Sequence, residues 1–217
     1  MFKRARAAGG LICLLCLVLA DGPALAQLQE PAVVPVEDYA LYDRVVTSKF
    51  LTNETRLVLI ERLTVSRLYP DQENPTTIAL FDERDLFDHR LPPDLVREFV
   101  FKNRQPARFS AQFNFGVRYR FVAPEGTEEP EVSLSVPAAW PPVGLTQDLS
   151  FLGRLVFSRV AYTLRSDQAL LYVEQHRPDG TGAGFLVWFA RQAADWSIID
   201  TEVLWSIRAP EEAAELR

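Results

Sequence analysis

The stretch that decides the fold is residues 158–200, which read SRVAYTLRSDQALLYVEQHRPDGTGAGFLVWFARQAADWSIID. Runs rich in β-branched, aliphatic and aromatic residues alternate here with short turn sequences, a pattern typical of strands joined by tight turns. The pattern predicts four strands, at residues 155–163, 169–175, 184–191 and 196–207. Because short turns join neighbouring antiparallel strands, we expect an antiparallel meander.

One of these strands is apolar on both of its sides. Residues 185–190 read FLVWFA, and a strand of this kind is covered on both faces. Apolar residues at helical spacing predict helices at residues 37–50 and 93–102, which are expected to cover one face. The other face needs the curvature of the sheet, the long loops or a second subunit. The expected fold class is therefore α+β, a curved antiparallel sheet packed on two helices in a cystatin-like roll.

Two more strands are expected ahead of the meander. Residues 56–66 are rich in β-branched and aliphatic side chains, and residues 108–122 alternate between apolar and polar positions. Residues 67–91, which lie between the second strand and the second helix, are expected to be irregular. The expected organisation is a signal peptide at 1–26, an extended lead-in at 27–36, a single domain at 37–208 and a flexible tail at 209–217.

The N-terminus has the features of a secretory signal peptide. Three basic residues precede an apolar run at residues 11–20, and Ala24-Leu25-Ala26 forms a small-x-small cleavage site. The apolar run is about half of the ~20 residues that a membrane-spanning helix needs, so a retained anchor is the less favoured alternative. Cleavage before Gln27 would place the mature protein in the periplasm or outside the cell.

Cleavage also changes the composition of the chain. Cys13 and Cys16 both lie in the apolar run, so the mature protein would have no disulfide and no cysteine nucleophile. Basic residues would fall from 23 to 20 and acidic residues from 29 to 28, which gives a net charge of about −8. A charge of this sign disfavours binding to nucleic acid or to an anionic membrane.

The C-terminal third of the chain also carries a recognisable order of short motifs. They are FSRVAY at residues 157–162, QALLYV at 168–173, GFLVWF at 184–189, WSII at 196–199 and WS at 205–206. This order resembles a family of uncharacterised exported bacterial proteins with an SRVxF…ALVYV…G…L…W.I…WxS pattern. FVFKN at 99–103 resembles the family's DFxxKN segment, although Glu98 replaces its Asp and the approach to the Ser-Arg strand is shortened to DLSFLGR. The resemblance implies export and an α+β fold; it implies no activity and no catalytic residues.

Ser158 and Arg159 are candidate ligand-binding residues at the start of the meander. Adjacent residues of a strand face opposite ways, so one of the two is expected to face a covered side. A covered arginine needs a carboxylate partner, and Glu174 or Asp200 on neighbouring strands is expected to supply it. Arg159 and its carboxylate partner form either a buried structural ion pair or a ligand-orienting site in the mouth of the roll.

Residues 81–90, FDERDLFDHR, contain the candidate metal ligands Asp82, Asp85, Asp88 and His89. Carboxylates and an imidazole can bind a divalent cation, but the spacing matches neither an EF-hand nor HExxH. The favoured interpretation is a solvated acidic loop that Phe81 and Phe87 attach to the protein. The second histidine, His176, is expected to be exposed beside a Gly-rich turn.

No catalytic motif stands out, since a GxSxG nucleophile elbow is missing. The sequence therefore favours an exported non-enzymatic domain that binds a small ligand or a protein partner, with no cofactor. A hydrolase or isomerase with a pocket inside the sheet is the alternative, and converging ionisable side chains would favour it. A homodimer through the second apolar face of residues 185–190 is a third possibility.

Overall fold

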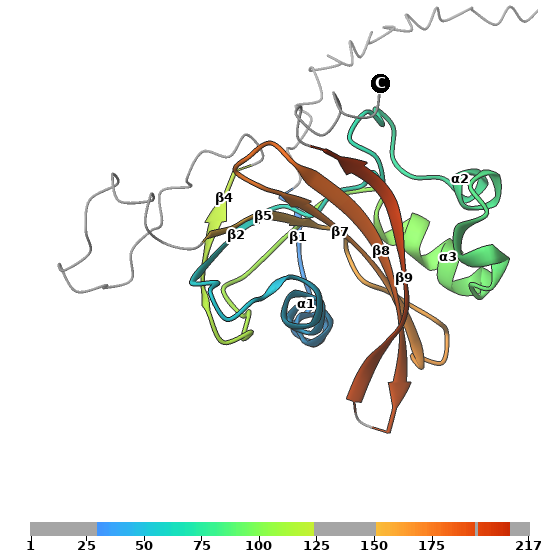
Figure 1. Cartoon of the computed structure of the whole chain (residues 1–217). Coiled ribbons are helices and arrows are strands. Elements are labelled where there is room, and N and C mark those ends of the chain that lie inside the picture. The colour runs from blue at the N-terminus through green and yellow to red at the C-terminus, as the bar shows by residue number, and fades with distance from the viewer. Residues whose placement is uncertain (1–29, 124–150, 194, 209–217) are drawn as a thin grey trace, which may run out of the picture. The chain divides into compact units, whose positions relative to one another are not determined.

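The computed structural model describes residues 30–123, 151–193 and 195–208. The expected signal peptide and the expected C-terminal tail lie outside these residues. The strands of the main sheet are β2 (Leu57–Glu61), β4 (Arg118–Val122), β5 (Phe151–Phe157), β6 (Ala161–Tyr162), β7 (Gln168–His176), β8 (Gly182–Gln192) and β9 (Asp195–Ile207). Their order is β4-β2-β5-β7-β8-β9, and the short β6 also pairs with β7 (Figure 1).

The sheet is mixed rather than wholly antiparallel. Strands β5, β7, β8 and β9 pair antiparallel in sequence order, which confirms the predicted meander. Strand β2, however, runs parallel to both of its neighbours, β4 and β5. The two parallel pairs join segments far apart in the chain, and no local pattern predicted them.

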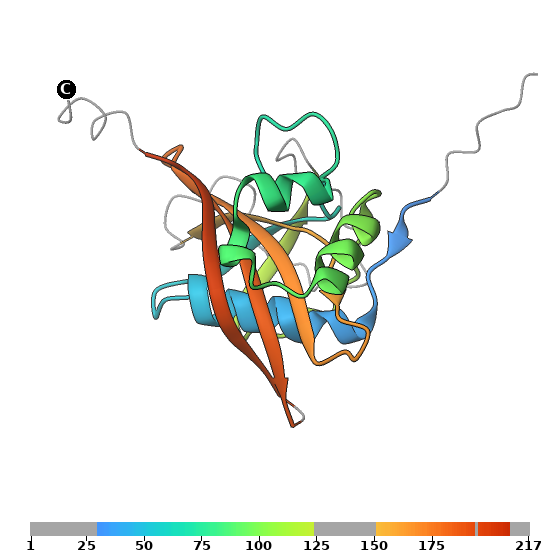
Figure 2. The same ribbon diagram turned by 90° about the vertical axis from the view of Figure 1, so that its right-hand side faces the viewer.

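Helices cover both faces of the sheet, which corrects the expectation that the two predicted helices share one face (Figures 1 and 2). On one face lies the continuous helical segment η1 (Val36–Asp38), α1 (Tyr39–Val45) and η2 (Val46–Phe50). On the other lie α2 (Ile78–Glu83), η3 (Leu86–His89) and α3 (Pro93–Lys102). The fold is thus α+β, and each face of the sheet has its own layer.

Strand β8 shows why two layers are needed. Val187 and Phe189 belong to the core beneath α1, whereas Leu186 and Trp188 belong to the core beneath α3. Both faces of the FLVWFA run are therefore covered, as predicted, but by helices of the same chain. The second apolar face of β8 is thus packed against η3 and α3 within the chain, and a homodimer stays a prediction.

Local signals explain the two predicted helices. Pro93 stands at the first helical position of α3 and Asp94 in its first turn, where both are favourable. Its buried residues, Leu95, Val96, Phe99 and Val100, recur at helical spacing. The predicted bounds of α3 are confirmed, and the helix expected at 37–50 is present.

The long strand predicted at residues 108–122 is wrong in its middle. Only β3 (Ala107–Arg108) and β4 are strands, and Gly116 between them has a left-handed φ of 84°. The alternating aromatic residues Phe109, Phe113 and Phe115 are nevertheless buried, in the core beneath α1. The alternation of apolar and polar residues here comes from burial of a loop, although a strand in a sheet would show the same alternation.

Four smaller differences separate the expected elements from the observed ones. β1 (Ala32–Val33) pairs with β3, so part of the lead-in is held in a two-stranded sheet. The strand expected at 155–163 breaks at 158–160 between β5 and β6, and the strand expected at 56–66 ends at Glu61. The segment expected to be irregular contains α2 and η3; Thr77 caps α2 by accepting a hydrogen bond from Leu80 N.

Candidate functional site

Two of the motifs behind the family resemblance, FVFKN at 99–103 and FSRVAY at 157–162, meet in the structure. Asn103, at the end of α3, is buried and binds the backbone of Arg159 in the break between β5 and β6. Its Oδ1 accepts from Arg159 N at 2.7 Å and its Nδ2 donates to Arg159 O at 3.2 Å. Ser158 Oγ accepts from Tyr172 N at 2.9 Å and donates to Arg159 O. These contacts show a structural role for both motifs, since they fix a break in the sheet.

The ion pair expected for Arg159 is wrong. Its guanidinium donates to the backbone carbonyl of Lys102 at 3.4 Å, and no carboxylate of the described residues pairs with it. Asp200 pairs instead with Arg90 at 2.7 Å, and Glu174 pairs with Arg67 and His176. The four candidate ligand residues are thus distributed over separate hydrogen-bond networks.

Glu174 is the centre of a buried polar network on the α3 face of the sheet. Its side chain is 0 % exposed. The carboxylate accepts from Tyr172 Oη at 3.2 Å, from His176 Nε2 at 2.8 Å and from Arg67 at 3.4 Å. Trp205 Nε1 in turn donates to Tyr172 Oη at 2.7 Å. The carboxylate is fixed in place, because both of its oxygens are engaged by hydrogen bonds from Tyr172, His176 and Arg67.

The strand register places a second carboxylate in the same network. Ile60, Leu155 and Val173 point into the core beneath α1, so their neighbours Glu61, Val156 and Glu174 point to the opposite face. Glu61 pairs with Arg154 at 2.8 Å. Glu61, Arg67, Arg154, Tyr172, Glu174, His176 and Trp205 are called the Glu174 cluster below.

Burial changes the protonation of this cluster. It raises the pKa of Glu61 to about 7, an effect larger than the opposing attraction of Arg154, and the nearby charge of Glu174 raises it further. Burial also raises the pKa of Tyr172, whose hydroxyl therefore stays protonated and donates to Glu174. The cluster is a set of ionisable groups at one place, which is the feature that the sequence reasoning named as favouring an enzyme.

Gly184 allows Trp205 to reach this cluster. Gly184 pairs with both Glu174 and Trp205 across the sheet. A Cβ at residue 184 would lie 2.1 Å from Trp205 Nε1 and 2.7 Å from Tyr172 Oη. The indole lies across the strand only because the position is glycine.

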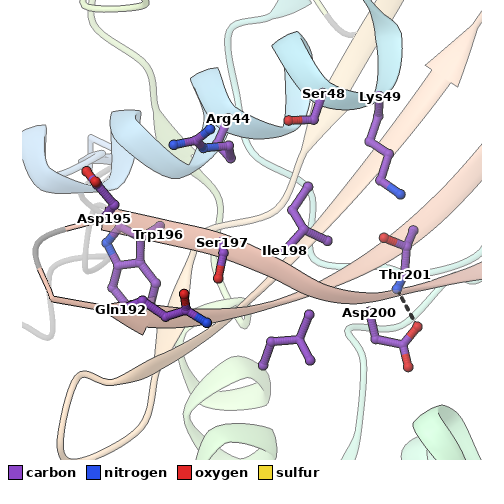
Figure 3. A pocket seen from close by; sticks show the side chains of 11 residues that line it. Arg44, Ser48, Lys49, Gln192, Asp195, Trp196, Ser197, Ile198, Asp200 and Thr201 are labelled. Atoms are coloured by element: carbon purple, nitrogen blue, oxygen red, sulfur yellow. Dashed lines mark hydrogen bonds between the residues drawn. The ribbon is translucent and has the colours of Figure 1, made fainter.

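A groove lies on the other face, between the helical segment α1–η2 and the edge strand β9 (Figure 3). It has a volume of about 780 Å³ and is lined by Arg44, Ser48, Lys49, Gln192, Asp195, Trp196, Ser197, Ile198, Ile199, Asp200 and Thr201. In Figure 3, Lys49 extends from the helix toward Thr201 and Asp200 on the strand. The groove is open and mostly polar.

The polar groups of the groove are incompletely paired. Neither Arg44 nor Lys49 has a hydrogen bond or a close ion pair with a described residue, and the buried Oγ1 of Thr201 likewise lacks a partner there. Asp200 is engaged by Arg90, and by Thr201 N at 2.8 Å. These contacts, with the Arg90 hydrogen bond the largest cause and a weaker attraction from Lys49, lower the pKa of Asp200. With Asp200 paired to Arg90, the remaining charges of the lining are those of Arg44, Lys49 and Asp195, a net of one positive charge.

The acidic stretch at residues 81–90 spans the end of α2 and η3, with exposed acidic side chains and buried apolar anchors that include Leu86. Phe81 and Phe87 are buried, as expected, and Phe87 N donates to Glu202 at 2.6 Å. Of the expected metal ligands, His89 and Asp85 pair with each other at 2.8 Å, whereas Asp88 lies near Arg90. Within the described residues, no three His, Cys, Asp or Glu side chains come together as a metal site would require.

Sequence reasoning missed most of the residues that these two sites use. Glu61, Arg67, Arg44 and Lys49 drew no prediction, and His176, expected to be exposed, is 26 % exposed and bound to Glu174. One local signal existed: Tyr172, Glu174 and His176 alternate along one strand and must share a face. Nothing local indicated which residues of other strands would meet them.

Comparison of the chain with protein-family models, curated proteins and solved structures found no match. Among the described residues, no helix is long and apolar enough to cross a membrane. Function is therefore argued from the two sites themselves.

Proposed function

We propose that this protein is an exported binding domain whose groove beside β9 holds an anionic group of a small ligand or a protein partner. The observation that carries the proposal is a pair of exposed cations, Arg44 and Lys49, that line one groove and have no partner among the described residues. A bound anion would supply the partner that both cations lack. Export is supported by the N-terminal sequence.

Charge selects the class of ligand. The groove is lined by two cations, Arg44 and Lys49, and by two carboxylates, Asp195 and Asp200. Arg90, which lies beside the groove, already neutralises Asp200. Lysine and arginine side chains on the helix wall would therefore attract a carboxylate or a phosphate. The floor adds Trp196 and Ile198, which offer apolar surface beside the charged wall. Pockets that bind small ligands commonly combine apolar walls with a few polar groups.

We place the fold in the cystatin-like roll class, in which a curved antiparallel sheet wraps a helix. The antiparallel order β5-β7-β8-β9 and the position of α1 against one face support this assignment. In such an arrangement the sheet is a rigid frame, and a ligand that binds between helix and edge strand meets pre-positioned side chains.

The test uses two anionic probes, citrate and a fluorescein-labelled hexaglutamate peptide. Binding is measured by calorimetry for citrate and by fluorescence anisotropy for the peptide. We expect saturable binding of at least one probe, and the double variant Arg44→Gln/Lys49→Gln should weaken it about tenfold or more. Arg97→Gln is the matched control, because Arg97 is an exposed arginine on α3, on the opposite face of the sheet.

The two probes separate the two kinds of ligand. Tight citrate binding with weak peptide binding indicates a small ligand, and the reverse indicates a protein partner. Absence of binding by both probes at millimolar concentration refutes the proposal. Equal losses in the double variant and in Arg97→Gln refute it as well.

A further inference from the structure

We propose that the Glu174 cluster is a second and independent site, in which His176 is the general base for water attack on a small carboxylic ester that carries an anionic group. This activity goes beyond binding in the groove, and none of the cluster residues lines that groove. The proposal rests on three features: an oriented imidazole, accessible guanidinium groups and the absence of another nucleophile in the cluster.

The imidazole of His176 is held in one orientation. A carboxylate only accepts hydrogen bonds, so Nε2 of His176 carries the proton that Glu174 accepts at 2.8 Å. Nδ1 is then the unprotonated nitrogen, and it has no hydrogen-bond partner among the described residues. The ring lies against Trp205, with 5.7 Å between the ring centroids. A histidine with a buried carboxylate behind one nitrogen and a free lone pair on the other is the arrangement of a general base.

Hydrogen bonds beyond the one to His176 hold Glu174 in place. Its other oxygen accepts from Tyr172, and Tyr172 accepts from Trp205. This chain crosses from β7 to β9 and prevents Glu174 from rotating away from His176. Glu174 is therefore a positioning residue, whereas His176 is the catalytic residue.

Two guanidinium groups define the charge of the substrate. Arg67 is 35 % exposed and Arg154 is 27 % exposed, so both border the solvent side of the cluster. The Nε of Arg67 is buried and has no hydrogen-bond partner among the described residues. Arg67 binds Glu174 only through NH2 at 3.4 Å, and the exposed part of its guanidinium is where a second anion can bind. The substrate should thus carry a carboxylate in addition to its ester.

The nucleophile is water. The cluster contains no serine, threonine or cysteine, and Nδ1 of His176 activates water rather than a side-chain hydroxyl or thiol. The oxygen of water bonds to the ester carbonyl carbon while His176 Nδ1 takes one water proton, and Glu174 stabilises the imidazolium. The bond to the alcohol oxygen then breaks, and His176 returns the proton to that oxygen. One ester and one water give one carboxylic acid and one alcohol.

The experiment measures hydrolysis of mono-4-nitrophenyl succinate, which is anionic, and of 4-nitrophenyl acetate, which is neutral. We expect the protein to prefer the succinate ester once the spontaneous hydrolysis of each ester, which for the succinate is fast because its own carboxylate attacks the ester, has been subtracted. His176→Ala should lower kcat/KM by about 100-fold or more, the range for loss of a general base. His89→Ala is the matched control, because His89 is the other histidine of the chain and its loss should change nothing.

Two further variants separate catalysis from folding. His176→Gln keeps an amide that can donate to Glu174 but has no base, so it should fold normally and be as inactive as His176→Ala. Glu174→Gln should lower kcat for both esters without changing KM, and Arg67→Gln should raise KM for the succinate ester but not for the acetate. Equal activity of His176→Gln and His89→Ala, or hydrolysis no faster than with free imidazole, overturns the proposal. Either result leaves the groove proposal untouched.

Discussion

Replacing Glu61 by Gln should change how stability depends on pH. Burial raises the pKa of Glu61 from 4.5 to about 7 in the folded chain. The folded state therefore binds a proton more tightly than the unfolded state, so this residue favours folding at low pH and loses that contribution as pH rises toward 7 and above. The side chain is only 8 % exposed, so solvent screening is small.

The magnitude follows from linkage. A shift of one pKa unit corresponds to about 1.4 kcal/mol, so the shift of Glu61 corresponds to roughly 3 kcal/mol in full. Between pH 5 and pH 8 this residue should lower the free energy of unfolding by about 2.5 kcal/mol. The Glu61→Gln variant lacks this titration. Its unfolding free energy should consequently fall less, or rise more, over that interval than that of the unmodified chain.

Urea unfolding at pH 5, 6, 7 and 8, followed by tryptophan fluorescence, measures the difference. The comparison uses the change with pH rather than the absolute stability, because the amide also leaves Arg154 with a neutral partner at every pH. Glu98→Gln is the control: Glu98 also pairs with a cation, Lys102, but at an exposed helix surface. Parallel pH curves for Glu61→Gln and the unmodified chain would refute the reasoning.

Three substitutions test the packing around the sites, each by urea unfolding. Tyr162→Phe removes the hydroxyl that donates to buried Asp38 at 2.8 Å, and should cost about 1–3 kcal/mol; an unchanged stability would contradict the pairing. Asn103→Ala removes the contacts that hold the break at Arg159 and should cost about 2 kcal/mol or more, whereas the exposed Arg104→Ala should cost little. Gly184→Ala should displace Trp205 from Tyr172 and change the tryptophan fluorescence; an unchanged spectrum would mean that the indole lies elsewhere.

The parts of the fold that were predictable depend on neighbours in the chain. Helix α3 was predicted with its bounds because Pro93, Asp94 and the apolar spacing all lie within ten residues. The hairpins β7–β8 and β8–β9 were predicted because their turns are short. The parallel pairing of β2 with β4 and β5 was not, since it joins Leu57 to Arg118 and Phe151 across long connections.

The loop at 109–117 shows a second limit. Alternating burial is evidence for a strand only when a partner strand is present. Here Phe109 and Phe113 pack against Tyr39, Tyr42 and Phe157 instead. Phe115 packs against Phe113 and Tyr119, and the aromatic cluster supplies the burial. Pattern alone therefore identified the buried side chains correctly and their secondary structure incorrectly.

Strand β9 shows a third limit. In this strand Trp196 and Ile198 point toward α1, so strict alternation would place Asp200 on the α1 face and Trp205 on the α3 face. The structure has two irregularities in the pairing of β8 with β9, between Trp188 and Phe189 and between Gly184 and Phe185. Each adds one residue to β9 and reverses the face of everything after it.

The first irregularity turns Asp200 and Glu202 to the α3 face, where they meet Arg90 and Phe87. The second turns Trp205 to the same face, beside Tyr172. Without the second irregularity the indole would point toward α1, and the hydrogen-bond chain that fixes Glu174 would lack its first donor. The orientation of His176 thus depends on one extra residue at the edge of the sheet, and bulges of this kind are found preferentially at edges and beside active sites.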